Sequence, residues 1–282
     1  SRSHLPEKNS KEYSQAVSDF YVGLAALEVG HDIYAEQKLS DLTKVAPGEP
    51  AGWANWGILA LRQRKFEAAA QRLGEARELA PDNAQISDLL GILDSQRGNS
   101  SAAIADLRKA VELNPRNLRA IYQLAEETER QGAENSEAQF EQLMQKILTA
   151  QPDNLAALLE LARVAAKRND AATLKSAVAQ IDAQSAAWPS EVQQQLKSVQ
   201  TAVANSDLHA AATQTTFLRN VLMRVPEYRI NLRAIKAAPG EEAHPFNHFV
   251  RMESPVSKPA PADTAISFNS KPITNLTSHW IW

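Results

Sequence analysis

The sequence predicts an all-α solenoid of about five helix pairs, followed by a helical cap and an extended tail. Two observations predict it. Four kinds of residue recur with a single period of 34 residues, and the apolar residues inside each period follow the spacing of helices. The recurring sets are Pro47, Pro81 and Pro115; Gly23, Gly57 and Gly91; Ala35, Ala69 and Ala103; and Leu39, Leu73 and Leu107.

The first three copies of the period are 16–49, 50–83 and 84–117, and each predicts two helices. In the second copy, one apolar face follows Trp53, Trp56 and Ala60, and a polar break over 62–65 ends it. A second apolar stripe then begins at Phe66 and stops at Pro81. Gly30, Gly98 and Gly132 stand in the breaks, where a positive φ is expected. Asn83, Asn117 and Asn154 stand where a helix N-cap is expected.

Two looser copies complete the array. The fourth copy is 118–154, with its extra residues in the polar segment 132–137, and the fifth is 155–185. The solenoid is therefore expected to span 1–185.

Two further helices are expected in the segment 186–225, where they would cap the open end of the solenoid. They are predicted over 189–204 and 207–224. The segment 226–282 holds half of the chain's 14 prolines, and we expect it to be an extended tail or a connector to a further domain.

The second copy resembles the tetratricopeptide repeat (TPR), and the match extends over roughly 16–185. The residues that carry the resemblance are Trp53, Trp56, Gly57, Ala69, Leu73, Ala76 and Pro81. The position that usually holds tyrosine differs, with Ala26, Ala60, Asp94, Thr128 and Ala165 in the five copies. The resemblance implies a right-handed superhelical solenoid, in which the first helix of each pair lines a concave groove that binds peptides.

The repeat register predicts which side chains line that groove. The apolar candidates lie in the first two copies: Phe20, Leu24, Leu27, Ile58 and Leu61. The polar and aromatic candidates lie in later copies: Asp88, Arg119, Tyr122, Glu126 and Arg163. The carboxylate clamp of some family members needs Lys and Asn where Phe20 and Leu24 stand, so that function is rejected. The alternative for the apolar set is ordinary packing between repeats.

Composition argues against several other classes of protein. The net charge of −3 argues against a nucleic-acid-binding surface, no apolar run is long enough for a membrane span, and cysteine is absent. Nucleophile elbows and phosphate-binding loops are also missing, so we expect neither enzymatic activity nor a cofactor. Pro245 separates His244 from His248 and disfavours a metal site there. The acidic cluster Glu126, Glu127 and Glu129 is expected to be a solvated helix face.

These observations predict a protein–protein interaction scaffold that binds an extended or helical peptide segment. The partner is a protein, a peptide or the chain's own C-terminal tail, and the oligomeric state stays open. Residues 217–282 are similar to the connector that joins TPRs to FG-GAP or VCBS-type β-propellers in bacterial exported proteins. That resemblance implies a periplasmic or extracellular location, with the cytoplasm as the alternative. It also implies an alternative role, as the non-catalytic positioning module of a larger exported enzyme or carbohydrate-binding protein.

Overall fold

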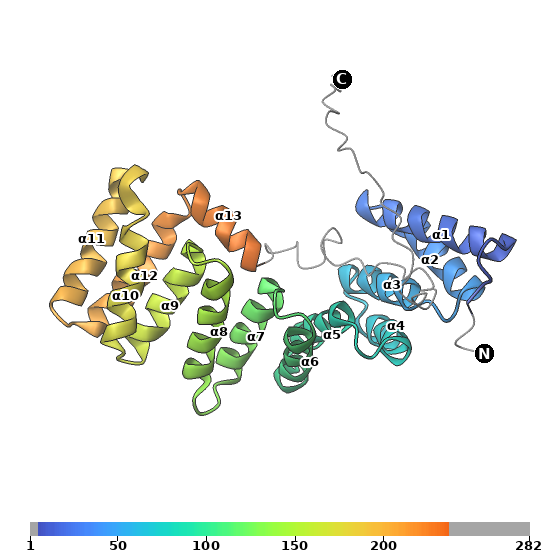
Figure 1. Cartoon of the computed structure of the whole chain (residues 1–282), viewed down its shortest axis with the longest axis horizontal. Coiled ribbons are helices and arrows are strands. Elements are labelled where there is room, and N and C mark those ends of the chain that lie inside the picture. Colours follow the sequence, from blue (N-terminus) through green and yellow to red (C-terminus); the bar gives the residue numbers. More distant parts are fainter. Residues whose placement is uncertain (1–4, 237–282) are drawn as a thin grey trace, which may run out of the picture. The chain divides into compact units, whose positions relative to one another are not determined.

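The computed structural model describes residues 5–236, and every regular element in that range is helical. The first ten α-helices form five consecutive pairs, as the 34-residue period predicts (Figure 1). Their bounds are α1 Lys11–Glu28, α2 Asp32–Val45, α3 Pro50–Arg62, α4 Phe66–Leu79, α5 Ala84–Gln96, α6 Ser100–Leu113, α7 Leu118–Gln131, α8 Ser136–Ala150, α9 Leu155–Lys167 and α10 Ala171–Asp182.

Each pair packs internally and then against the next pair along the chain. The second helix of one pair contacts the first helix of the following pair, so α2 packs on α3, α4 on α5, α6 on α7 and α8 on α9. This nearest-neighbour stacking is the general arrangement of solenoid proteins. None of the helices in 5–236 has the length and apolar content that crossing a membrane requires.

The predicted helix ends are confirmed. Asn83 accepts hydrogen bonds from the amides of Gln85 and Ile86, at 2.9 and 3.2 Å. Asn117 and Asn154 cap α7 and α9 in the same way, through the third amide of each helix. These side chains satisfy amides that have no partner inside the helix. The three predicted turn glycines have φ values of 76°, 79° and 65°.

The paired helices pack closely at the glycines that recur with the 34-residue period. A Cβ atom added to Gly91 would lie 2.6 Å from Leu107 Cγ, and one added to Gly57 would lie 2.7 Å from Leu73 Cγ. The side chain nearest to Gly57 is therefore Leu73, which lies one helical turn after Ala69 on α4. The leucine needs the open space, because its branched Cγ fills the crossing point.

The last helices depart from the repeat register. After a short 3₁₀ turn over Ser185–Ala187 come α11 Ser190–Ala204 and α12 Leu208–Leu222. Here α12, the second helix of its pair, packs against α9, whereas α11 contacts α10. The order of inner and outer helices is thus reversed relative to the five preceding pairs.

The expectation of an extended chain from Pro226 is wrong for its first ten residues, which form α13, Pro226–Ile235. Pro226 is the first residue of the helix, where its missing amide needs no acceptor and its fixed φ suits the helix. Tyr228, Leu232 and Ile235 are spaced four and three residues apart and form its apolar face. The rest of the predicted tail, 237–282, lies outside the described residues.

The buried side chains form two hydrophobic clusters rather than one. The first extends from Ala16 to Leu93 and the second from Ile104 to Ile235. The boundary falls inside the third repeat, between α5 and α6.

Candidate peptide-binding surface

Helix α13 packs on α7 and α9, the first helices of the fourth and fifth repeats (Figure 1). We call the part of α7 and α9 that contacts α13 the α7–α9 surface. Tyr228 and Ile235 of α13 are 2% and 0% exposed and belong to the C-terminal hydrophobic cluster. The resemblance implied that the first helices line the groove, and here they hold a helical segment of the same chain.

Polar contacts fix the position of α13 at three points. Arg119 on α7 donates from Nη2 to the main-chain oxygen of Arg233, at 3.0 Å. The amide of Leu155, at the start of α9, donates to Asn231 Oδ1 at 2.7 Å. An α13 side chain thereby satisfies an amide that has no acceptor within α9. Lys236 forms an ion pair with Glu126, and its ammonium lies 5.5 Å from the centre of the Tyr122 ring.

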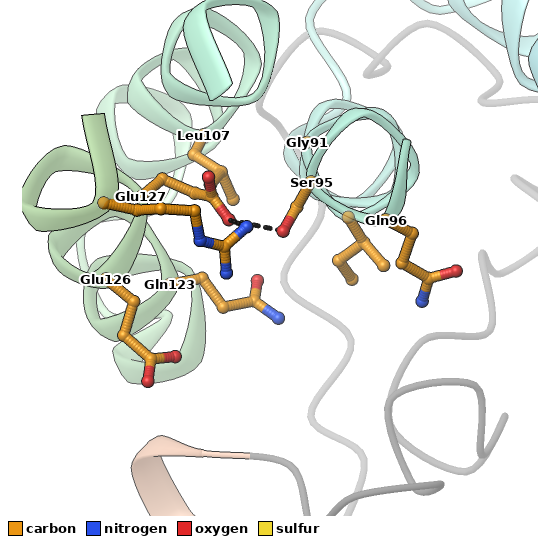
Figure 2. A pocket seen from close by; sticks show the side chains of 9 residues that line it. Gly91, Ser95, Gln96, Leu107, Gln123, Glu126 and Glu127 are labelled. Carbon is orange, nitrogen blue, oxygen red and sulfur yellow. Dashed lines mark hydrogen bonds and ion pairs between the residues drawn. The ribbon is translucent and has the colours of Figure 1, made fainter. Parts of the chain in front are cut away.

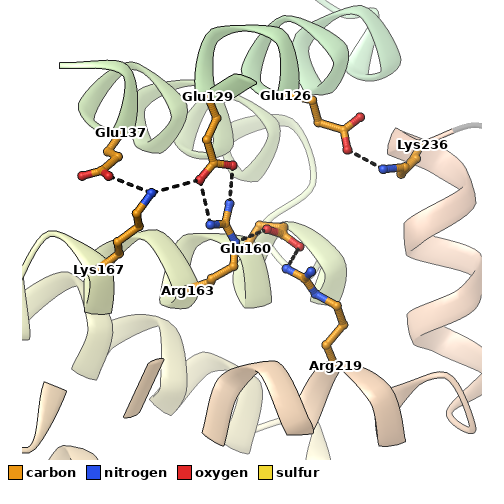
Figure 3. A network of polar contacts seen from close by, with 8 residues as sticks. All are labelled: Glu126, Glu129, Glu137, Glu160, Arg163, Lys167, Arg219 and Lys236. Carbon is orange, nitrogen blue, oxygen red and sulfur yellow. Dashed lines mark hydrogen bonds and ion pairs between the residues drawn. The ribbon is translucent and has the colours of Figure 1, made fainter. Parts of the chain in front are cut away.

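A charged network lies beside these contacts and joins α7, α9 and α12 (Figure 3). Arg163 makes two parallel hydrogen bonds to Glu129, each 2.8 Å long, and a third to Glu160 at 2.7 Å. Arg219 on α12 pairs with the other oxygen of Glu160. The network therefore links the fourth repeat, the fifth repeat and the cap.

Lys167 extends the network to the start of α8. Its ammonium lies 2.8 Å from Glu137 and 3.8 Å from Glu129. Burial by itself would lower the pKa of Arg163, but its hydrogen bonds to Glu129 and the charge of Glu160 outweigh it and raise the pKa. For Glu129, burial opposes and the Arg163 hydrogen bond favours the charged form, and the net effect lowers its pKa. Both groups stay ionised at neutral pH.

A groove of about 420 Å³ runs beside α13. Its floor is formed by apolar and aromatic side chains, and burial raises the pKa of Tyr228 to about 12, so this phenol stays neutral. Arg229 and Arg233 are exposed at the rim and carry no ion pair to any residue in 5–236. The lining residues are Tyr122, Glu160, Arg219, Asn220, Met223, Tyr228, Arg229, Leu232, Arg233 and Lys236. The groove thus combines an apolar floor with a basic rim.

Four of the five predicted polar and aromatic groove residues lie on or near the α7–α9 surface, and Asp88 lies on α5. Arg119, Tyr122 and Glu126 contact α13, and Arg163 anchors the network next to them. Asp88 lines a separate cleft of about 490 Å³ that Arg119 also borders. Burial raises the pKa of Asp88 to about 6, although a 3.1 Å hydrogen bond from Asn117 and the charge of Arg119 oppose the shift.

The five predicted apolar residues lie elsewhere, in the first two repeats. Phe20, Leu27, Ile58 and Leu61 are buried in the N-terminal hydrophobic cluster, and Leu24 is half-buried against it. Packing between repeats accounts for this burial. A role for these residues in binding a peptide stays a prediction.

Sequence reasoning missed part of the site and misjudged one residue. Glu160, Arg219 and the docked helix α13 were not predicted as parts of a site. The expectation of a solvated acidic face is wrong for Glu127, which is only 2% exposed; Glu126 and Glu129 are half-buried and ion-paired. The helical spacing of Tyr228, Leu232 and Ile235 was the available signal for α13, but the density of prolines downstream obscured it.

The part of the chain that the structure describes holds no group of three or more His, Asp or Glu side chains arranged to bind a metal. The pair His244 and His248, considered on sequence grounds, lies outside it.

No protein-family model matches the sequence, and no curated protein matches it. Among solved structures, the chain is similar to PilF of Pseudomonas aeruginosa, with a TM-score of 0.56 and 17% identity, covering 78% of this chain and 98% of PilF. It is also similar to MamA of Desulfovibrio magneticus RS-1 (TM-score 0.50, 17% identity, 60% and 92% coverage). A third similar structure is YrrB, a TPR protein with an unusual peptide-binding site (TM-score 0.51, 14% identity, 63% and 91% coverage). The chain therefore has a TPR-like fold.

Proposed function

We propose that the protein is an interaction scaffold, which binds a helical or extended segment of a partner protein in the groove beside α13, with α13 in place on the α7–α9 surface. Binding would need no covalent chemistry. The observation that carries the proposal is α13 itself, a helix that this surface already holds.

The contacts to α13 show how this part of the solenoid recognises a helix. Arg119 binds a main-chain oxygen, so this contact does not depend on the side chain of the bound residue. Glu126 forms an ion pair with Lys236, and the Tyr122 ring lies close to the same ammonium group. The buried Tyr228 and Ile235 supply apolar anchors. Helices recognised in grooves generally use such apolar anchors at spacings of three and four residues.

The groove beside α13 is the space that remains open to a partner segment. Its volume of about 420 Å³ is within the range of well-formed ligand sites. Met223 is 47% exposed at its wall and offers a flexible apolar contact. The fold it shares with YrrB, a TPR protein with a peptide-binding site, supports the same general role.

The full chain can be tested with a library of displayed random peptides. We expect selected peptides to bind in solution, with Met223→Ala and Arg229→Ala each weakening binding about fivefold or more, because both line the groove. Leu113→Ala on α6 and Lys197→Ala on α11 are the matched controls, exposed residues of similar type that should leave affinity unchanged.

Two results would overturn the proposal. One is a selection that yields no peptide with saturable binding to the folded chain. The other is a set of peptides whose affinity is equally insensitive to both groove variants.

The exported location and the FG-GAP or VCBS context stay proposals from sequence. Of the connector-like segment 217–282, the described residues cover only the end of α12 and α13. A positioning role in a larger exported protein rests on that resemblance alone.

A further inference from the structure

A second pocket, separate from the α13 groove, lies between the third and fourth repeats. It encloses about 250 Å³ and is bounded by α5, α6 and α7 (Figure 2). Its lining residues are Gly91, Ile92, Ser95, Gln96, Leu107, Gln123, Glu126, Glu127 and Arg130. Of its lining residues, only Leu107 belongs to one of the two hydrophobic clusters.

Glu127 is the most deeply buried acidic side chain of this pocket, at 2% exposure. Its Oε1 atom accepts a hydrogen bond from the Ser95 hydroxyl and lies 2.9 Å from Arg130 Nη1. Its Oε2 atom is buried and has no hydrogen-bond donor. Both oxygens of a buried carboxylate normally accept hydrogen bonds, because a buried acceptor without a donor costs about 1–3 kcal/mol of folding free energy.

Gln123, one helical turn before Glu127 on α7, presents a second unmet acceptor. Its Oε1 atom is also buried without a donor. Both side chains line the same pocket, and Figure 2 shows them on one side of it, facing the helix that carries Ser95. Two buried acceptors therefore point to a missing group that has at least two hydrogen-bond donors.

We propose that this pocket binds a positively charged nitrogen group, a guanidinium or a primary ammonium on an aliphatic stem. The donors of that group would bind Glu127 Oε2 and Gln123 Oε1, and the stem would lie against Ile92 and Leu107. Glu126 is already paired with Lys236, and the charge of buried Glu127 is shared only with Arg130, whose side chain is 55% exposed, so a cation gains more from Glu127 than a neutral amide does. The inference goes beyond the proposed function, since it concerns a different pocket and needs no peptide.

The test is an NMR titration of the isotopically labelled full chain with butylguanidinium and butylammonium, at about 0.15 M salt to screen exposed acids. We expect saturable shifts centred on Gly91, Ser95 and Gln123. The neutral probe pentanamide, which keeps the N–H donors, is expected to bind about tenfold more weakly. Comparing the two cations shows whether the pocket prefers the planar or the compact group.

Variants of the full chain separate a specific site from general attraction. Glu127→Gln should weaken binding of both cations about tenfold, because it removes the charge and leaves the shape. Gln123→Leu provides a second variant that removes only the other acceptor and should weaken binding about fivefold. The control is Glu112→Gln, an exposed acid on α6, which should change nothing.

The inference would be overturned by equal shifts for pentanamide and the cations, by unchanged affinity in Glu127→Gln, or by shifts spread over exposed acids. A slowly exchanging Gln123 side-chain amide in the unliganded chain would also overturn it, because the amide would then donate to Glu127 itself. None of these outcomes bears on the α13 groove, so the two proposals fail separately.

Discussion

Arg119 and Asn231 show how single polar side chains hold a helix on this solenoid. Arg119 binds a main-chain oxygen near the end of α13, and Asn231 accepts a hydrogen bond from the first amide of α9. Each contact serves a backbone group that lacks a partner within its own helix. These two side chains therefore define where α13 lies along α7 and α9.

The glycine at the helix crossing of the third repeat gives the first residue-scale prediction. Gly91→Ala should destabilise the fold by about 1–3 kcal/mol, because the new Cβ overlaps Leu107 Cγ and this outweighs the gain in helix propensity. Gly74→Ala on α4, where a Cβ meets nothing within 4 Å, should instead stabilise by about 0.5–1 kcal/mol. Urea unfolding measures both changes, and equal effects would contradict this account of the crossing.

Asp88 gives a prediction about pH. Burial raises its pKa in the folded state to about 6, above the ordinary value of 3.8, so the folded chain holds this proton more tightly than the unfolded chain. The stability that this provides is fully present below pH 3.8 and is lost as the pH rises through about 6. Relative to Asp88→Asn, the wild type should lose about 1–3 kcal/mol between pH 4 and pH 7. Urea unfolding across this range measures the difference, and a constant difference would refute it.

For single residues, the sequence predicted those whose role depends on neighbours a few positions away. The capping asparagines and turn glycines follow from neighbours three or four residues away, so their positions could be predicted. Glu127 could not, because its burial depends on how α5 and α6 pack against α7. A charged residue in an acidic run gives no local sign of that packing.

Among the elements, α13 is the least expected and the most informative. It has no counterpart in the repeat pattern, yet it contacts the first helices of two repeats. Its position was not predictable from periodicity, since it occurs once and a proline-rich segment follows it. The reversed packing of α12 on α9 was also unpredictable, because both cap helices carry an apolar face.

Two isoleucines on α13, one buried and one exposed, test whether the buried face of the helix holds it in place. Ile235 is 0% exposed, whereas Ile230 is 66% exposed on the same helix. Ile235→Ala should cost about 2–4 kcal/mol and release α13, which hydrogen–deuterium exchange would show as faster exchange over 226–236. Ile230→Ala should change neither quantity by a measurable amount. Equal exchange in the two variants would mean that α13 is not held by its buried face.

At the scale of the described chain, the two hydrophobic clusters suggest two cooperative units. Solenoids unfold as sums of local and nearest-neighbour terms, so separate clusters can unfold in separate transitions even though α5 and α6 pack closely at Gly91 and Leu107. We expect urea unfolding to show different midpoints for the regions on either side of the third repeat. Trp53 and Trp56 report on the first cluster and Trp188 on the second, so tryptophan-to-phenylalanine variants that also replace Trp280 and Trp282 can isolate each signal. Coincident midpoints in all variants would contradict two units.

The 34-residue period made the repeat architecture predictable, because each pair packs mainly on its neighbours in sequence. The α7–α9 surface was predictable only in part. The register placed Arg119, Tyr122, Glu126 and Arg163 near α13, but α9 and α12 contribute Glu160 and Arg219 through contacts between distant segments. Those contacts follow from tertiary packing, which a period does not encode.

The central claim is that the α7–α9 surface holds a helical segment through contacts that include the pair Lys236–Glu126. Zero-length carbodiimide coupling of the wild-type chain tests it most directly, since it joins only amines and carboxylates that touch. The account predicts a Lys236–Glu126 cross-linked peptide by mass spectrometry, absent in Glu126→Gln. Coupling of Lys236 to other acids, with no link to Glu126 in the folded wild type, would contradict it.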